Sequence, residues 1–295
     1  MTIGPSTPGE RALPDVAVTG MGAVCGACDA GPHLRFRKLR KFMGKQDVLA
    51  LVAAARAVQA AGLEAPLGER CGLYAAVGYI PFATDDINRL LDASLDREQF
   101  SMTRFAANAF GAINPLLTFR VLPNMPAFHV SLNFDIQGPY AVSYPGIGQF
   151  YSVLEEAIAA LESRIIDVAL VGAVADQRNF LVEHHFSRMT PPVEPERLED
   201  AAAFLVLERR VEAIGRGATL RARLLEYRLE YSAVEPFAGR APSECFARDG
   251  VCVPAFRELG PVSLGLALTE SARGRVTHRA RSRDGFTADS TWEVA

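Results

Sequence analysis

Apolar and polar positions along the chain predict strands separated by helices. Mostly apolar segments of strand length lie at 15–24, 70–80, 140–144, 167–175 and 201–209. Apolar residues recur at helical spacing over 46–61, 84–95 and 150–163. Buried strands that alternate with helices are typical of an α/β fold whose sheets are covered by helices.

Glycines and polar residues delimit some of these elements. The run at 15–24 ends in glycines, so we expect its strand to enter a turn there. Gly62 follows 46–61 directly and is a suitable residue to end that helix. Near the end of the chain, 277–294 resembles two strands around a glycine, whereas 219–231 fits a strand or a helix.

Composition narrows the class of protein. The chain has 295 residues, a net charge of −3 and 22% charged residues, which argues against intrinsic disorder. A near-neutral balance gives no basic face for nucleic acid, and no run of 18 apolar residues predicts a membrane span. Residues 1–14 lack the apolar core of a signal peptide, so we expect a flexible leader there. Five cysteines are few for this length, which favours reduced thiols and a cytoplasmic protein.

Cysteine and histidine pairs offer little chemistry. Cys25 and Cys28 have a redox or zinc spacing, but no second such pair exists, and their glycine-rich surroundings favour a turn. His184 and His185 are adjacent, so their rings point away from each other in any regular element. The sequence therefore predicts no metal site and no cofactor, and it contains none of the common nucleophile, metalloprotease or nucleotide-binding motifs.

One dense basic cluster stands out. Its members are Arg35, Arg37, Lys38, Arg40, Lys41 and Lys45. Such a cluster can attract an acidic partner by its charge. It is equally compatible with an ordinary solvated loop, and both interpretations stay open.

Several segments, in order, resemble the β-ketoacyl synthase family. VAVTGMGAV (16–24) is similar to the family's first strand, and residues 114–139 resemble the run from an Asn-Met element through a histidine-containing helix to Gly-Pro. DVALVGAVA (167–175) and 198–224 resemble the segments that complete the first half. The resemblance implies a thiolase-like fold layered α-β-α-β-α. It also implies one domain over 15–295, with halves at about 15–214 and 215–295.

The residues that the family uses for catalysis are missing. A ketosynthase attaches its acyl chain to a cysteine at the start of a buried helix. By the resemblance, Ile147 occupies that position here, and no cysteine lies between Cys71 and Cys245. LGPVSLGLALTESA (259–272) is similar to the helix that follows a catalytic histidine, yet Pro261 or Val262 stands in its place. The resemblance therefore implies that this chain alone does not catalyse the condensation.

The second half is abbreviated, because only about 75 residues follow the Arg-Gly-Ala turn at 216–218. The final segment still resembles the family's glycine-rich hairpin at Gly285-Phe286. A silent, shortened member resembles the chain length factor, or ketosynthase-β, of type II polyketide synthases. The short second half favours the forms found in highly reducing, polyene-type systems.

This resemblance implies partners and site residues. The partners are an active ketosynthase in a heterodimer and, transiently, an acyl carrier protein, which Arg37 and Lys41 would dock. The expected dimer interface includes Pro139, Tyr140, Val142 and Tyr144. The expected gate of the acyl tunnel is Phe82, with Ile87 and Leu91 further along one helical face.

Two alternatives remain. The chain could be a stand-alone protein that binds an acyl or acyl-carrier ligand in the old pocket. It could also be a thiolase-fold enzyme with repurposed chemistry at Gln149 or His129, although the resemblance assigns His129 to the core. Ile87 and Leu91 are equally compatible with ordinary core positions.

Overall fold

The computed structural model describes residues 15–232, 243–248, 251–282 and 285–295; the leader expected at 1–14 lies outside them. Ten strands form one mixed sheet in the order β10-β9-β11-β12-β8-β1-β7-β6-β2-β5. Its first half contains β1 (Val16–Cys25), β2 (Cys71–Val77), β5 (Tyr140–Ser143), β6 (Val168–Ala175) and β7 (Ala201–Arg209). Its second half contains β8 (Ala222–Tyr231), β9 (Ser243–Arg248), β10 (Val251–Pro254), β11 (Gly274–Arg281) and β12 (Phe286–Val294).

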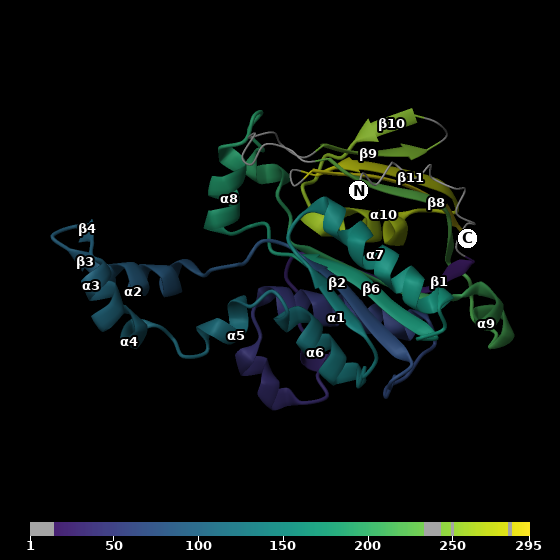
Figure 1. Ribbon diagram of the computed structural model, residues 1–295, viewed down its shortest axis with the longest axis horizontal. Helices are drawn as coiled ribbons and strands as arrows, with labels where there is room; N and C mark the ends of the chain where they lie inside the picture. Colours follow the sequence, from purple (N-terminus) through teal and green to yellow (C-terminus); the bar gives the residue numbers. More distant parts are fainter. Residues whose placement is uncertain (1–14, 233–242, 249–250, 283–284) are drawn as a thin grey trace, which may run out of the picture.

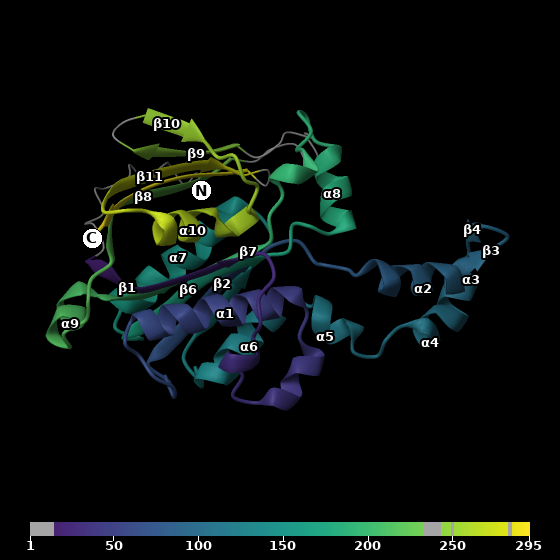
Figure 2. The same ribbon diagram turned by 180° about the vertical axis from the view of Figure 1, so that it is seen from behind.

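Helices cover this sheet in layers (Figures 1 and 2). The outer helices α1 (Lys45–Ala60) and α6 (Met125–Phe134) pack on one face of the first half-sheet. The inner helix α7 (Ile147–Glu162) contacts strands of both half-sheets, and α10 (Ser263–Glu270) packs on β1 and β7. The predicted α/β, thiolase-like fold is therefore confirmed.

Shorter elements connect these layers. The remaining helices of the main body are α5 (Leu117–Val121), α8 (Phe180–Ser187) and α9 (Arg210–Gly215). Short 3-10 helices are η1 (Gly31–His33), η2 (Arg37–Phe42), η4 (Pro195–Arg197) and η5 (Gly260–Val262). No helix among the described residues is long and apolar enough to cross a membrane.

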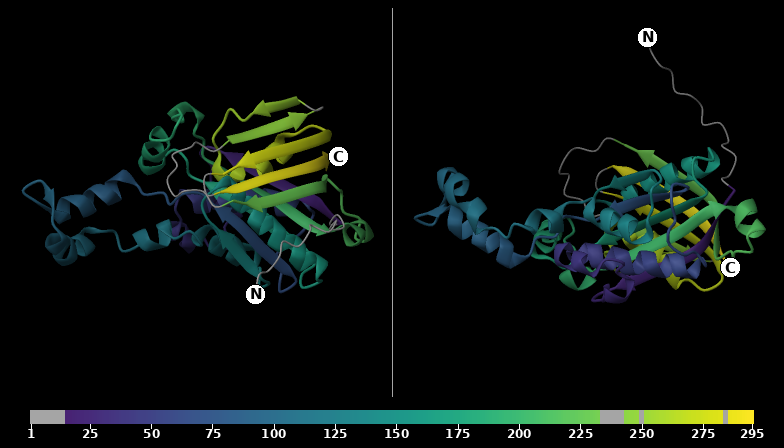
Figure 3. Two further views of the ribbon diagram at one scale, coloured as in Figure 1. Left: turned by 45° about the horizontal axis from the view of Figure 1, so that its top comes forward. Right: turned by 90° about the horizontal axis from the view of Figure 1, so that it is seen from below.

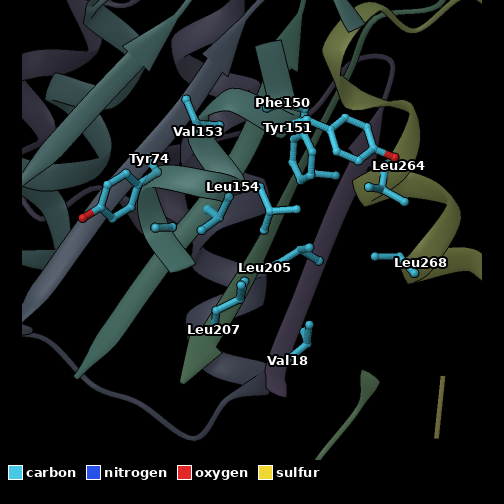
Figure 4. Close-up of a cluster of buried hydrophobic side chains, with 14 of the residues drawn as sticks. Val18, Tyr74, Phe150, Tyr151, Val153, Leu154, Leu205, Leu207, Leu264 and Leu268 are labelled. Carbon is cyan, nitrogen blue, oxygen red and sulfur yellow. The ribbon is translucent and has the colours of Figure 1, made fainter. Parts of the chain in front are cut away.

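The alternation of side chains in β7 explains why the sheet has two cores. Ala203, Leu205 and Leu207 belong to the inner core with α7 and α10, whereas Phe204 and Val206 belong to the outer core with α1 and α6. All these side chains are fully buried. Figure 4 shows the inner core, where side chains of α7 and α10 lie near Leu205 and Leu207 of β7. A run that is apolar at every position thus reflects a strand covered on both faces.

The glycines of the first strand have a different role from the predicted one. β1 continues through Gly20 and Gly22 to Cys25, so no turn occurs at these glycines. A Cβ atom on Gly20 would lie 2.1 Å from the backbone oxygen of Ala57 in α1, and one on Gly22 would lie 2.3 Å from that of Ala53. The glycines therefore let α1 approach the sheet closely.

The second half-sheet shows where the chain is shortened. Residues 219–231, undecided from sequence, contain the strand β8, and the two expected terminal strands are β11 and β12. Burial alternates along β8 and β11, with charged side chains on the exposed face, such as Arg279, which pairs with Asp289 at 3.1 Å. Among the described residues after β8, α10 lies against the first half-sheet, so no helix covers this outer face.

An arm projects from the body between β2 and α5 (Figures 1 and 3). It contains α2 (Thr84–Ser94), the hairpin β3 (Leu95–Asp96) and β4 (Gln99–Phe100), α3 (Met102–Arg104), a π-helical turn η3 (Phe105–Ala109) and α4 (Phe110–Ala112). The principal contacts of these elements are with one another. The arm is therefore an extension of about 30 residues with little core of its own.

Candidate functional site

The N-terminus of α7 lies in the inner layer. Ile147 is the first residue of this helix and is buried, and Gly146 precedes it as the N-cap. The helix begins three residues earlier than its apolar spacing predicts. Phe286 packs against the same turn, because a Cβ atom on Gly148 would lie 2.4 Å from the Phe286 Cβ atom. The helix terminus can stabilise an anion, but its first side chain is aliphatic.

The segment expected to have lost its histidine lies against α7. Pro261 and Val262 are part of η5, are fully enclosed, and contact α7 and β6 through that turn. Neither side chain can transfer a proton or donate a hydrogen bond. The positions expected for the nucleophile and for one histidine therefore hold three apolar side chains in one region of the inner layer.

Two polar side chains lie beside η5. Gln177 is 1% exposed, and neither polar atom of its amide has a hydrogen-bond partner in the described part of the chain. Its amide lies next to Gly260, where an added Cβ atom would be 3.1 Å from Nε2. Glu258 is also buried, and burial raises the pKa of its carboxyl to about 8, with a further contribution from the charge of Glu244. Glu258 is therefore mainly protonated at neutral pH.

A cavity of about 720 Å³ opens at the ends of β1, β2 and β6. Its wall includes the N-terminus of α1, Phe82 before the arm, and Arg120 of α5 after it. Basic and acidic side chains on the wall are Arg40, Lys45, Arg120, Arg178, Asp86, Asp176 and Glu183. The cavity is thus a mixed polar and apolar space at the base of the arm.

Lys45 is fixed at this wall by two carboxylates. Its Nζ atom lies 2.9 Å from Asp176 and 2.7 Å from Asp200. Burial lowers the pKa of Lys45, but the hydrogen bonds to the two carboxylates outweigh it and raise the pKa overall. Burial raises the pKa of Asp176 to about 6. The sequence analysis placed Lys45 in the basic cluster and did not predict this triad. The available signal was that Asp176 directly follows β6 and Asp200 directly precedes β7.

The expected gating residues separate in space. Phe82 is half-buried and lines the cavity. Ile87 and Leu91 lie on α2 in the arm, do not line the cavity, and Leu91 is 42% exposed. Neither is buried, so they are not core residues of this chain. The structure therefore brings only Phe82 to the wall of a cavity.

The expected interface residues lie at an open edge of the sheet. β5 is the edge strand and pairs in parallel with β2. Tyr140 is 73% exposed and Tyr144 is 40% exposed, while Pro139 is exposed and Val142 is half-buried. The arm adds further exposed apolar side chains, with Phe100 and Met102 more than half exposed. The structure therefore leaves exposed apolar side chains beside an open strand edge and on the arm.

The basic cluster is divided by the fold. Arg37 and Lys41 lie on η2 and are exposed, and neither forms an ion pair with another described residue. The Lys41 ammonium lies 4.9 Å from the centre of the Phe42 ring. Arg35 lies 3.7 Å from Asp135, and Lys45 is neutralised by its two carboxylates. Only part of the cluster is therefore available to a partner.

Cysteines and histidines form no metal site within the described residues. The chain turns at Gly26, between the free thiols of Cys25 and Cys28, whose pKa values burial raises. Cys245 is disulfide-bonded, which corrects the expectation that the thiols are all reduced. His185 bonds the Tyr79 hydroxyl at 3.2 Å, so it is held in a structural contact.

His129 and Gln149 show no arrangement for catalysis. Burial lowers the pKa of His129 to about 4, so its ring is neutral at physiological pH. Its Nε2 atom lies 3.9 Å from a carboxylate oxygen of Asp47, beyond hydrogen-bond distance. Gln149 lies in the first turn of α7, two residues after Ile147. The predicted assignment of His129 to the core agrees with its complete burial.

The thiolase-like layers and the helix terminus at Ile147 define a ketosynthase-type scaffold. The family Beta-ketoacyl synthase, N-terminal domain, matches residues 29–206, which is more than half of the chain. The chain therefore belongs to the β-ketoacyl synthase family. No curated protein matches it.

Solved structures agree with this fold. A chain of the AntDE:AntF complex, a type II polyketide synthase acyl-carrier protein with its ketosynthase bound to the hexaketide, has a TM-score of 0.69 and 15% identity. The match covers 95% of this chain and 99% of that one. A β-ketoacyl synthase from Burkholderia phymatum STM815 has a TM-score of 0.56 and 19% identity over 75% of this chain and 65% of its own.

A third structure is the ishigamide ketosynthase/chain length factor, with a TM-score of 0.54 and 23% identity. The match covers 75% of this chain and 64% of that one. This chain thus spans less than two thirds of the last two structures, but nearly the whole of the AntDE:AntF chain. At these identities the likeness establishes the fold.

Proposed function

We propose that this chain is the non-catalytic, chain-length-factor-like subunit of a type II polyketide synthase and pairs with an active ketosynthase. The observation that carries the proposal is the side chain at the start of α7. A ketosynthase needs a thiolate there, and Ile147 has no atom that can form or release a thioester. Pro261 and Val262 likewise offer no acid, base or hydrogen-bond donor in η5.

The outer surface of the chain supports pairing. β5 leaves its backbone hydrogen-bonding groups open on one side, with Tyr140 and Tyr144 exposed at that edge. Tyrosine is among the residues enriched in interface centres, because a large ring is buried at a small cost in entropy. We infer that β5 pairs with the corresponding strand of the ketosynthase, with Pro139 and Val142 in the same contact.

The arm supports the same partner. It exposes Leu91, Phe100 and Met102, and an isolated hairpin of helices of this length has too little core to be stable alone. We infer that the ketosynthase covers these side chains. Such an arrangement would place Ile87 and Leu91 at the partner's acyl tunnel, although they lie away from the cavity of this chain.

The proposal also assigns a gate of the acyl tunnel and a docking surface for the acyl carrier protein. Phe82 stands at the root of the arm, on the cavity wall, where its ring can limit the length of a chain in the tunnel. Arg37 and Lys41 are exposed on η2 and can attract an acidic acyl carrier protein. The near-complete match in length to a chain of the AntDE:AntF complex supports a role for a shortened second half in a type II synthase.

The second half also informs the type of synthase. Its outer sheet face has no helix in the part of the chain that the structure describes, whereas β5 is retained at the opposite edge of the sheet from β10. Pairing and tunnel surfaces can therefore remain intact in a short chain. Because the family resemblance links such a short second half to highly reducing, polyene-type systems, we infer a system of that type for this subunit.

Co-expression with the ketosynthase encoded beside it tests the proposal. A tag is placed on this chain alone, and the purified material is assayed for elongation of acyl groups on the carrier protein. We expect an equimolar complex that elongates, and no elongation by this chain alone. The complex should elongate acyl groups with Ile147 unchanged in this chain. Loss of the nucleophile of the partner ketosynthase should abolish elongation.

Two results would contradict this function. A chain that purifies alone, beside a ketosynthase that works equally well without it, would remove the heterodimer. The cavity of about 720 Å³ would then make a stand-alone acyl-binding protein the next hypothesis, tested by mass spectrometry of ligands retained on the purified chain. Elongation by this chain alone would instead show that it is an enzyme.

A further inference from the structure

A second cavity lies far from β5 and from the arm, between α10 and the β9–β10 hairpin. Its volume is about 360 Å³, at the small end of the range for ligand sites. Most of its wall is apolar and includes Phe246, Leu259, Leu266, Ala267 and Val276. The charged groups on the wall are two carboxylates, Glu244 and Glu270, and one guanidinium, Arg257.

A buried chain of hydrogen bonds ends at this wall. The Trp292 indole donates to Ser290 at 2.9 Å, and the Ser290 hydroxyl lies 2.8 Å from the Tyr151 hydroxyl. The Tyr151 hydroxyl lies 2.6 Å from Nδ1 of His278, whose Nε2 atom lies 2.5 Å from Oε1 of Glu244. Tyr151, His278 and Trp292 are fully buried, and Ser290 is 2% exposed.

One assignment of protons satisfies every donor in this chain. Ser290 donates to Tyr151, Tyr151 donates to Nδ1 of His278, and His278 donates from Nε2 to Glu244. In that assignment the imidazole is neutral and Glu244 is an ionised carboxylate. The reverse direction would leave the Ser290 proton without an acceptor. In this assignment the ionised carboxylate of Glu244 lies at the cavity wall.

Packing fixes the position of this carboxylate. The His278 ring is stacked between Phe246, with ring centres 4.7 Å apart, and Tyr151, at 5.8 Å. The Glu244 side chain is only 6% exposed, so its free rotation is small. Glu244 therefore accepts the His278 hydrogen bond and also lines the cavity. The placement of Glu244 at the wall is what a binding site requires.

No permanently charged basic side chain of the residues that the structure describes forms an ion pair with Glu244. Within the described residues, the only basic group that forms an ion-pair contact with it is His278, which is neutral in the assignment above. Arg257 is already paired with Glu270 at 2.7 Å and with Glu199 at 3.3 Å. The wall thus has a net negative charge beside a largely apolar space.

We propose that this cavity binds a small organic cation, namely a primary ammonium group on an apolar body, with the ammonium on Glu244. The apolar body would lie against Phe246, Leu266 and Val276. A metal ion fits less well, since no cluster of three ligating side chains exists among the described residues. The site is independent of pairing with a ketosynthase, because neither β5 nor the arm contributes to it.

Titration of the purified full chain, with its co-purified partner if one is present, tests this site. The probes are n-hexylammonium and, as its neutral counterpart, n-hexanol, and binding is followed by calorimetry. We expect saturable 1:1 binding of hexylammonium that is about tenfold or more tighter than that of hexanol, because the ammonium forms a charged hydrogen bond. Equal affinity for the two probes, or no saturable binding, would overturn the proposal.

Variants identify the side chain responsible. Glu244→Gln keeps an acceptor for His278 but removes the charge, so it should remove the preference for hexylammonium and leave hexanol binding unchanged. Ala267→Phe reduces the cavity volume but leaves the Glu244 carboxyl in the chain, and it should weaken both probes at least tenfold. Glu226→Gln, which removes an exposed charge on the outer face of β8, is the matched control and should change nothing.

These variants also keep the test decisive if one of them is unstable. Thermal unfolding checks that each variant is folded before titration. If Glu244→Gln does not fold, Ala267→Phe alone decides: retained hexylammonium binding in that variant would place the ligand elsewhere and reject this cavity. Retained preference for hexylammonium in a folded Glu244→Gln chain would reject the carboxylate as its partner.

Discussion

Glu258 should make the stability of this protein depend on pH. Its side chain is buried beside η5, where Oε1 accepts a hydrogen bond from the Gly260 amide at 3.3 Å. Backbone hydrogen bonds to Arg197 and Glu199 fix the segment, so the carboxyl cannot turn towards water without breaking them. Burial, and then the charge of Glu244, raises its pKa from 4.5 to about 8.

This shift sets both the sign and the size of the effect. The folded protein holds the Glu258 proton more tightly than the unfolded chain, so this stabilisation is complete below pH 4.5 and is lost as pH rises to about 8. A difference of this size corresponds to roughly 5 kcal/mol, with 1.36 kcal/mol for each pKa unit. Relaxation of the buried site around the ionised carboxylate at high pH would make the measured change in the free energy of unfolding smaller than this value.

Replacement by glutamine isolates this contribution. Glu258→Gln keeps the size and the acceptor but cannot ionise, so its unfolding free energy should rise relative to the natural chain by several kcal/mol between about pH 5 and about pH 9. Urea unfolding of both chains across that range measures the difference. Glu270→Gln, at an exposed carboxylate, is the control and should show no such trend.

One result would refute the reasoning. If Glu258→Gln and the natural chain differ by the same amount at both ends of the pH range, Glu258 ionises as easily in the folded protein as in the unfolded one. The carboxyl would then have access to water that its burial argues against. Glu244→Gln provides a further check, because removing that neighbouring charge should lower the pKa of Glu258 and flatten the pH dependence.

Four further outcomes are expected. Tyr140→Ala should weaken the complex with the ketosynthase about tenfold in co-purification, and full retention would move the interface away from β5. Phe82→Ala should lengthen the products of the reconstituted complex; an unchanged distribution would remove this ring from the gate. Charge reversal at Arg37 and Lys41 should slow carrier-dependent elongation about tenfold, mainly at low salt; unchanged turnover would leave η2 as a solvated segment. Asp47→Asn should gain stability over the natural chain as pH rises from about 4 to about 7, because burial raises the pKa of Asp47 to about 7; parallel pH profiles in urea unfolding would contradict this.

Apolar patterning predicted the elements that are buried on both faces. The strands β6 and β7 and the helix α1 lie within one residue of their predicted segments, and β2 ends three residues before its own, because burial of both faces requires an uninterrupted pattern. β8 could not be decided, since one exposed face gives it Arg223 and Arg228 among its apolar residues. Such a strand and an amphipathic helix differ only in period, and short segments distinguish the two periods poorly.

The candidate site was predictable in part. The family resemblance placed Ile147 at the position of the nucleophile, and the structure puts it at the first residue of a buried helix. The resemblance could not separate Phe82 from Leu91, because the projection of the arm depends on how α2 leaves the sheet. Nor could it reveal the Glu244 network, whose members come from three separate strands and one helix.

The sequence by itself determined the fold family, and it predicted which catalytic side chains are missing from the expected positions. The order of residues along the chain shows which residue type stands at each position that the resemblance assigns. The prediction that a thiol or an imidazole is missing there therefore needs no three-dimensional structure. Tertiary structure alone decided which polar groups meet. Lys45 finds Asp176 and Asp200, and His278 joins Tyr151 to Glu244, through contacts between residues far apart in sequence. Burial and pairing set the charge of such groups, and both depend on how the layers pack.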